Sequence, residues 1–212
     1  PLGRDLILRE AVRFIDQRGQ DRLTMRRLGA ELSVEAMALY RYVPGREQLL
    51  DGVVEAARRT AAKHVLFASG SGVYGDLGET EAHEDWGPLI PVSTYGASKL
   101  AGEGLISSYC HMFGLTARVF RFANVVGPRQ THGVGFDFVR SLLEDGSSLR
   151  ILGDGTQSKS YIHVDDVVDA VLTGHAADGV YEVYNVATGD YITVREIADL
   201  ALECVGLNPG ET

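Results

Sequence analysis

The stretch Ser93-Thr94-Tyr95-Gly96-Ala97-Ser98-Lys99 places a tyrosine and a lysine four residues apart. On a helix this spacing puts both side chains on one face. A free tyrosine has a pKa near ~10, and a fixed ammonium close by stabilises the phenolate and lowers that pKa. The spacing therefore predicts Tyr95 as a general acid/base and Lys99 as the residue that tunes it. The alternative is a surface tyrosine above a solvated lysine.

The sequence around this pair, from about residue 61 onward, alternates short apolar runs with helical patterns. Short apolar runs between turn residues are typical of buried parallel strands. Such strands are predicted over residues 64–69, 117–122, 161–164 and 184–187, and helices over 95–109, 136–143, 167–171 and 194–205. Asp165 and Thr193 are predicted to cap the last two helices. The loop over 123–129 follows a strand's carboxyl end, where open α/β sheets bind ligands.

Residues 1 to about 60 show helical periodicity instead. A first helix runs from Leu6 to Ile15 with Gly19 as its stop, and a second begins after the N-cap Thr24. Ser33 is predicted to cap a third, short helix over 34–40. After the break at Pro44-Gly45, a fourth helix starts at Arg46. Two short helices joined by a tight turn behind a longer helix predict a helix-turn-helix.

Charge divides the 212-residue chain in the same place, although the net charge of the whole is −9. Residues 1–62 carry a net charge of +2 and residues 63–212 a net charge of −11, which suggests two parts with different partners. No apolar run approaches the roughly 18 residues that span a membrane, and no secretory pattern is present, so a cytoplasmic protein without a membrane partner is expected. Cys110 and Cys204 lack metal-ligand spacing and are predicted to be buried free thiols, and no metal site is expected.

The N-terminal segments 23–32, 34–44 and 46–50 resemble, in order and spacing, the DNA-binding head of TetR-type repressors, over about residues 4–58. The resemblance implies a homodimer that binds double-stranded DNA through residues 24–46, with the third helix in the major groove. It implies that bases or groove walls are contacted by Glu35, Ala36, Met37 and Arg41, and phosphates by Thr24, Tyr40, Tyr42 and Arg46. Alternatively, the tyrosines pack against the bundle and the arginines form a solvated face. Ser33 stands where the family usually has glycine.

The segments 67–75, 95–99, 121–128, 153–155, 159–166 and 184–189 resemble the extended short-chain dehydrogenase/reductase superfamily, most closely the UDP-glucose 4-epimerase-like enzymes. The resemblance implies NAD as cofactor and a nucleotide sugar as substrate, with Tyr95 as catalytic acid/base and Lys99 on the nicotinamide ribose. It places Phe122 beside the nicotinamide, although a core role in the strand is an equal alternative. Asn124 and Lys159 would approach the diphosphate of the substrate.

The catalytic hydroxyl departs from this pattern. The family places Ser or Thr five residues before the glycine of its Val-Tyr-Gly motif, and here that position is Gly70. Ser69 and Ser71 flank it, and either is a candidate for the catalytic hydroxyl; the alternative for both is local turn hydrogen bonding. His163 is predicted to be a structural residue at a strand end, and Asp165 and Asp166 to be helix N-caps.

A dinucleotide also needs a glycine-rich turn between a strand and a helix, with an acidic residue about 20 positions further on. The 212 residues contain no such fingerprint. The expected fold class is α/β, an incomplete Rossmann-like parallel sheet with helices, preceded by an all-α helix-turn-helix head. The predicted domains are residues 1–60 and 61–212. Three functional hypotheses follow: an NAD-dependent nucleotide-sugar epimerase impaired by the missing fingerprint, a TetR-type DNA-binding module, and an engineered or rearranged fusion with no evolved activity.

Overall fold

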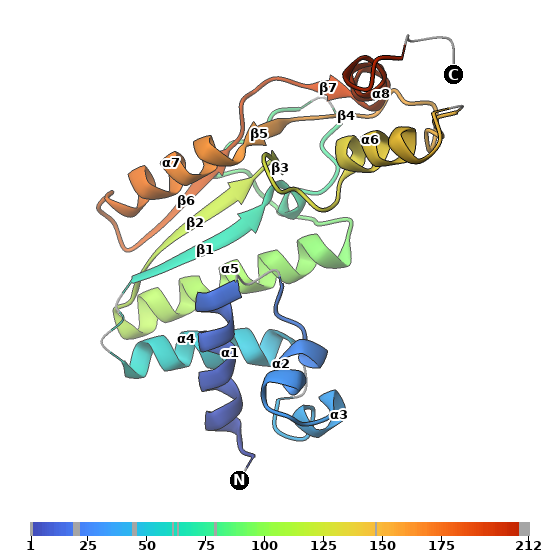
Figure 1. Cartoon of the computed structure of the whole chain (residues 1–212). Coiled ribbons are helices and arrows are strands. Elements are labelled where there is room, and N and C mark those ends of the chain that lie inside the picture. The colour runs from blue at the N-terminus through green and yellow to red at the C-terminus, as the bar shows by residue number, and fades with distance from the viewer. Residues whose placement is uncertain are drawn as a thin grey trace. The chain divides into compact units, whose positions relative to one another are not determined.

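The structure is a computed structural model, and it describes residues 2–18, 22–43, 46–60, 62, 64–78, 80–146 and 148–207, with the side chains of 46–50 left out (Figure 1). The chain divides into two compact units, the first comprising Pro1–Phe120 with Ala177–Tyr184 and the second Arg121–Ala176 with Asn185–Thr212. None of the helices in the described ranges is long and apolar enough to cross a bilayer.

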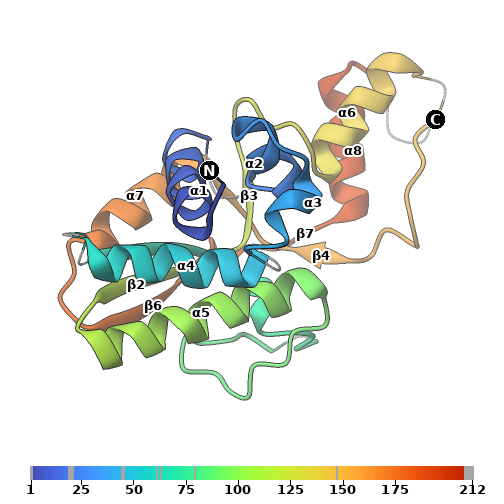
Figure 2. The ribbon, with the colours of Figure 1, turned by 90° about the horizontal axis from the view of Figure 1, so that it is seen from below.

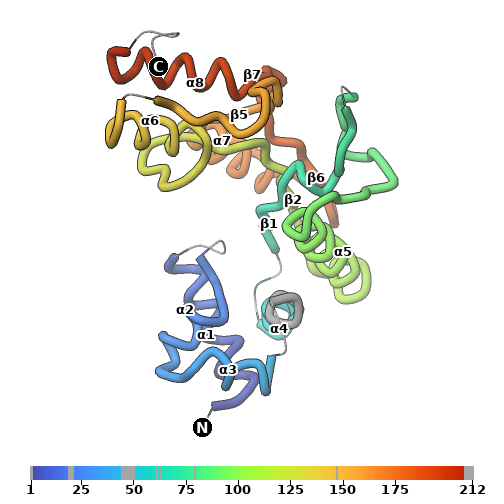
Figure 3. The backbone as a smooth tube through the Cα atoms, turned by 90° about the vertical axis from the view of Figure 1, so that its right-hand side faces the viewer, coloured from blue at the N-terminus to red at the C-terminus, as the bar shows by residue number. Residues whose placement is uncertain are grey.

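The N-terminal part of the first unit has the four predicted helices, α1 (Arg4–Arg18), α2 (Met25–Glu31), α3 (Ala36–Leu39) and α4 (Arg46–Arg59). Figure 3 shows α1, α2 and α3 grouped together. Their apolar faces meet in a core whose fully buried members include Ile7, Leu28 and Leu39. Thr24 caps α2 as predicted, since its side chain accepts a hydrogen bond from the Arg27 amide at 3.2 Å. The predicted stops at Gly19 and Pro44-Gly45 lie outside the described residues.

The turn between α2 and α3 differs from the prediction. The N-cap of α3 is Glu35, and Ser33 instead has a φ of +54°. That left-handed conformation suits glycine, which has no Cβ to clash. It gives a physical reason for the glycine that TetR-type heads usually carry at this position. A serine there is strained but tolerated.

Helix α4 joins the head to the helix that carries Tyr95, α5 (Thr94–Phe113), and Figure 2 shows α4 between α1 and α5. On one side, a Cβ at Gly52 would lie 2.3 Å from a methyl carbon of Leu8 in α1, so the two helices touch at this glycine. On the other, the Tyr109 hydroxyl of α5 donates to Asp51 Oδ1 at 3.0 Å. Val54 completes the contact, because it is buried in one core with residues of α5.

The C-terminal turn of α4 carries an ion-pair cluster that makes a pH-dependent prediction. Arg58 donates to both carboxylate oxygens of Glu55 at 2.6 Å, and Arg59 donates to one of them at 2.8 Å. The hydrogen bonds from Arg58 are the main reason that the pKa of Glu55 falls from 4.5 to about 2. Because the pKa of Glu55 is lower in the folded state, its ion pairs stabilise the folded chain fully above about pH 4.5. This stabilisation is lost as the pH falls through about 2.

We expect a carboxyl-detected NMR titration of Glu55 to show a midpoint near 2, and Arg58→Gln to raise it toward 4.5. Arg13→Gln on α1 is the matched control, because Arg13 pairs with Glu10, at 3.5 Å, and lies on another helix. A wild-type midpoint of 4.5 would contradict the cluster.

The main sheet has three strands in the order β1-β2-β6, namely β1 (His64–Gly70), β2 (Thr116–Phe122) and β6 (Tyr181–Val186). The sequence predicted all three, with bounds shifted by up to three residues. β1 is followed by the 3-10 helix η2 (Ser71–Val73), and α5 packs against β1. Residues of α4, β1, α5 and β2 share a core that includes Val54, Phe67, Ile106 and Val119. This core positions the Tyr95 helix on the sheet.

The described residues of the second unit form two small sheets and three helices. β3 (Asn124–Val126) pairs in parallel with β5 (Tyr161–His163), and β4 (Ser158–Lys159) pairs antiparallel with β7 (Ile192–Thr193). The helices are α6 (Val134–Glu144), α7 (Val164–His175) and α8 (Val194–Cys204). Apolar residues of α6 and α8 meet in a separate core that includes Phe138 and Leu202.

Three predictions for this unit were wrong. Residues 124–126 form strand β3 and not a loop, because they find a parallel partner in β5. The N-cap of α7 is His163, and neither Asp165 nor Asp166; both lie in the first turn of the helix. The His163 ring accepts from the Asp165 amide at 3.3 Å, so this histidine has a structural role. Cys204 is exposed, whereas Cys110 is buried as predicted, and burial raises the pKa of the Cys110 thiol. The cap at Thr193 is confirmed, with Glu196 completing a capping box.

Candidate active site

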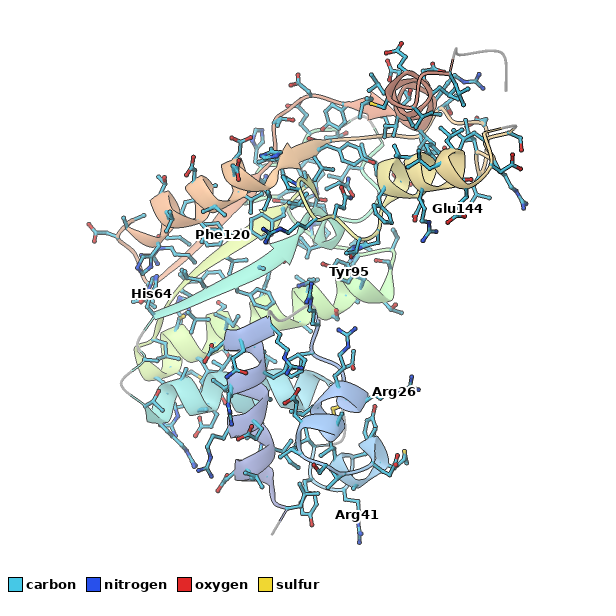
Figure 4. All side chains as sticks on the ribbon, in the orientation of Figure 1. Arg26, Arg41, His64, Tyr95, Phe120 and Glu144 are labelled. Carbon is cyan, nitrogen blue, oxygen red and sulfur yellow. The ribbon has the colours of Figure 1, made fainter. Side chains whose placement is uncertain are left out.

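The tyrosine–lysine pair lies at the start of α5. Ser93 caps the helix by accepting from the Gly96 amide at 3.0 Å, which places Tyr95 in the first turn (Figure 4). The Tyr95 side chain is 54% exposed. The predicted spacing is thus realised on a helix, with the phenol within reach of solutes.

Lys99 is held in place much more tightly than a surface lysine. It is 3% exposed, and its Nζ donates to the carbonyl oxygen of Ala68 in β1 at 2.8 Å. The same Nζ lies 5.5 Å from the ring centroid of Phe67 and 5.4 Å from that of Tyr95, within the range of a cation–π interaction. The sheet therefore fixes the lysine ammonium beside the ring of the tyrosine.

Ser69 forms a hydrogen bond with a residue that was not predicted from the sequence to belong to the site. Its hydroxyl donates to Glu103 Oε1 at 2.5 Å, and the two residues are 3% and 2% exposed. Glu103 lies one helical turn beyond Lys99, on the face that already holds Tyr95 and Lys99. The spacing of four from Lys99 is the signal that could have revealed it. The bond ties the end of β1 to α5.

Ser71 lies on the other side of Gly70, at the first position of η2, and is exposed. A Cβ at Gly96 would lie only 2.3 Å from the carbonyl oxygen of Gly72. The turn that carries Ser71 therefore packs directly on the first turn of α5, which carries Tyr95. Gly96 is needed for this close approach, since a side chain at this position would push the two backbones apart.

The other residues predicted to bind the cofactor or the nucleotide sugar lie in the second unit. Asn124 begins β3, and its side-chain amide donates to the carbonyl oxygen of Ser160 at 3.1 Å. Lys159, which precedes Ser160, is exposed on β4, so the structure brings Asn124 and the Lys159 segment together. Phe122 is half-buried at the end of β2.

The predicted DNA-contacting residues lie on the helical head. Met37, Tyr40 and Tyr42 are 73%, 41% and 41% exposed, so the tyrosines do not pack into the bundle. Arg41 is also exposed (Figure 4), as are Thr24 and Glu35, and Ala36 is half-buried. The side chain of Arg46 lies outside the described residues. Elsewhere in the described ranges, no cluster of three or more His, Cys, Asp or Glu side chains could hold a metal ion.

Comparison with known proteins identifies both parts. Residues 48–187 match the family described as NAD dependent epimerase/dehydratase family, and residues 7–53 match bacterial regulatory proteins, tetR family. The two matches confirm the two resemblances predicted from the sequence. The matched ranges overlap at residues 48–53, within α4.

Two solved structures and one curated protein show how far the likeness extends. The chain is 36% identical over 159 residues to a UDP-glucose 4-epimerase of Mycolicibacterium smegmatis, covering 73% of this chain and 50% of the relative. A crystal structure of UDP-galactose 4-epimerase matches with a TM-score of 0.71 and 37% identity, over 78% of this chain and 56% of that one. MoeE5, solved in complex with UDP-glucose and NAD, matches with a TM-score of 0.72 and 30% identity, over 82% and 58%.

The chain spans about half the length of the curated relatives it matches. The epimerase match covers well over half of the chain and includes β1, α5 and the tyrosine–lysine pair. The solved relatives share the Rossmann-like α/β fold, which confirms the predicted fold class. The chain therefore belongs to the NAD dependent epimerase/dehydratase family, with a tetR-like helical segment at its N-terminus.

Proposed function

We propose that this chain catalyses the epimerisation of a nucleotide sugar, of the UDP-glucose 4-epimerase type, with NAD as a weakly bound cofactor. The observation that supports this most strongly is the Lys99 ammonium, buried and held 5.4 Å from the ring centroid of an exposed Tyr95. Family membership adds the reaction class. The nucleotide sugar and NAD come from what relatives are named for or solved with.

We assign the roles of the chain's own residues from their positions together with the resemblance to the family. Tyr95, as the phenolate, accepts the proton of a sugar hydroxyl and becomes the phenol, which later returns that proton; its exposure at the helix start leaves it accessible to the sugar. The Lys99 ammonium stabilises the phenolate before the proton is transferred. Ser71 donates a hydrogen bond to the sugar from the adjacent turn, whereas Ser69 holds β1 against α5 through Glu103. Asn124 and Lys159 bind the diphosphate.

The residues present fit only the reacting end of NAD, which supplies reversible hydride transfer when it is bound. Lys99 and Phe122 would adjoin the nicotinamide and its ribose. The pyrophosphate needs a free glycine-rich turn, and the turn Gly70-Ser71-Gly72 does not provide one, because Gly72 is packed against Gly96. We therefore propose that NAD binds far more weakly than in relatives with the fingerprint.

The direct test is to incubate the full chain with UDP-galactose and millimolar NAD and to follow UDP-glucose by proton NMR. We expect slow conversion that needs added NAD. An absence of UDP-glucose after prolonged incubation with folded protein would overturn the proposed activity.

Two serine variants separate the roles assigned to Ser69 and Ser71. We expect Ser69→Ala to lower the free energy of unfolding by about 1–3 kcal/mol, since a buried carboxylate loses a donor. Ser71→Ala should change stability by less than ~0.5 kcal/mol, because the residue is exposed, but should slow conversion roughly tenfold or more. Urea unfolding and the conversion assay measure both. The reverse pattern would assign the catalytic hydroxyl to Ser69.

A second candidate function is DNA binding by the head. The observation in its favour is the exposed set Met37, Tyr40, Arg41 and Tyr42 around α3, within the segment that matches tetR-family regulators. Phosphate contacts release counterions, so the affinity for duplex DNA should fall steeply as salt rises. Binding that is absent at low salt, or that does not change with salt, would exclude this function.

Arg41→Ala provides the matching variant. We expect it to weaken duplex binding and to reduce the salt slope by about one counterion. Arg13→Ala on α1 is the control, because Arg13 is exposed but lies outside the predicted contact segment. Equal effects of the two variants would indicate nonspecific charge attraction. If both conversion and DNA binding fail, a fusion without evolved activity is the remaining explanation.

A further inference from the structure

An apolar cavity of about 120 Å³ lies within the first unit, between the head and the Tyr95 helix. It is lined by Ile15 of α1, by Val53 and Val54 of α4, and by Leu105 of α5. The remaining wall comes from β1, including Phe67, and from the neighbouring residues of α5. All lining side chains are aliphatic or aromatic, apart from one glycine. None of the residues assigned to catalysis or DNA contact lines it.

The hollow is partly open to solvent, and its mostly apolar wall binds water poorly. A buried water needs two to four polar partners, and no lining side chain offers one. Lining atoms that face solvent lack the dispersion contacts that apolar partner atoms would make. An uncharged apolar molecule makes those contacts without burying a polar group. An engineered cavity of roughly 150 Å³ lined by Leu, Ile and Phe binds benzene or xenon.

The size of the cavity excludes larger occupants. A volume of about 120 Å³ has room for a benzene-sized molecule or the end of an alkyl chain, and not for a peptide strand or helix. The β1 side offers access, since Leu66 is a lining residue there and is 43% exposed. We propose that this cavity binds a small, uncharged apolar molecule, which holds α1 and α4 against β1 and α5.

Binding at this place has a structural consequence. Ile15 belongs to the head helix α1, whereas Leu105 belongs to the helix that carries Tyr95. An occupant touches both, so it stabilises the folded arrangement of the head and the sheet by mass action. This role does not depend on the proposed epimerase activity or on DNA binding.

The test is a titration of the full chain with benzene, followed by the methyl signals in a carbon–proton NMR spectrum. We expect saturable shifts at Ile15, Val53 and Leu105, and none at the surface residues Leu143 and Leu172, which are 73% and 62% exposed. Shifts that do not saturate, or that are equally large at Leu143, would overturn the proposal.

A filled cavity provides the matched variant. Leu105→Phe should lower the benzene affinity by about tenfold or more, because the larger side chain occupies the space. Met112→Phe, on the same helix but 70% exposed, should leave the affinity unchanged. If Leu105→Phe does not fold, the ¹²⁹Xe chemical shift is measured in solutions of the wild-type chain and of Met112→Phe. A bound-xenon shift that both chains show supports the site. Unchanged benzene affinity in folded Leu105→Phe, or no protein-dependent xenon shift, overturns it.

Discussion

Tyr95→Phe is expected to lower the rate of UDP-galactose conversion by roughly 10²–10⁴-fold, while the free energy of unfolding changes by less than ~0.5 kcal/mol. The variant removes one hydroxyl from a side chain that is 54% exposed, so little packing is lost. The aromatic ring that faces the Lys99 ammonium remains. Only the group that accepts and returns the proton disappears.

The matched control is Tyr191→Phe, because Tyr191 is a similarly exposed tyrosine, at 62%, with no assigned role. It should convert UDP-galactose at the wild-type rate. Rates for both variants are compared at the same concentrations of UDP-galactose and NAD, with folding checked by circular dichroism. A Tyr95→Phe variant that keeps more than half of the wild-type rate would remove Tyr95 from the mechanism.

Phe67→Ala is expected to destabilise the chain by about 3–5 kcal/mol, the largest stability effect that we predict. Phe67 is 5% exposed, and its ring packs so closely on α5 that a Cβ at Gly102 would lie 2.6 Å from it. The same ring faces the Lys99 ammonium at 5.5 Å. Truncation therefore opens a void in the core that holds the catalytic helix on β1, next to an existing cavity.

Leu66→Ala, one position earlier on the same strand, is the control. Leu66 is 43% exposed, so we expect its truncation to cost about 1 kcal/mol or less. Urea unfolding followed by circular dichroism measures both variants. Because Val54 of α4 shares the core with Phe67, the helical signal of α4 should be lost in the same transition. Equal destabilisation by the two variants would contradict the burial of Phe67.

Features set by local sequence were predictable. Thr24 and Thr193 cap their helices as predicted, since a hydroxyl before an apolar helical pattern satisfies the first amides from within one turn. The helix at Tyr95 was predictable for the same reason. Local spacing also placed Lys99 on the face of Tyr95, and the structure adds that β1 buries the ammonium.

Features set by distant partners were not predictable. Residues 124–126 are a strand only because β5 lies beside them, and no local pattern shows that pairing. The φ of +54° at Ser33 depends on how the turn closes, and it made a predicted N-cap impossible. The burial of Glu103 was not predicted, because a glutamate on a helix is expected at the surface. Its buried hydrogen-bond partner Ser69 lies 34 residues away in the sequence. Cys204 was predicted to be buried because its sequence neighbours are apolar, but it is exposed at the end of α8.

The most direct test is the dependence of the conversion rate on NAD concentration, from about 10 µM to 10 mM, for wild type and Tyr95→Phe. A chain with the catalytic tyrosine–lysine pair but no pyrophosphate turn should show a Tyr95-dependent rate that rises into the millimolar range without saturating. Saturation at micromolar NAD would contradict the weak cofactor binding. A rate that stays at zero at every NAD concentration would contradict the assignment of Tyr95 and Lys99 as a working catalytic pair.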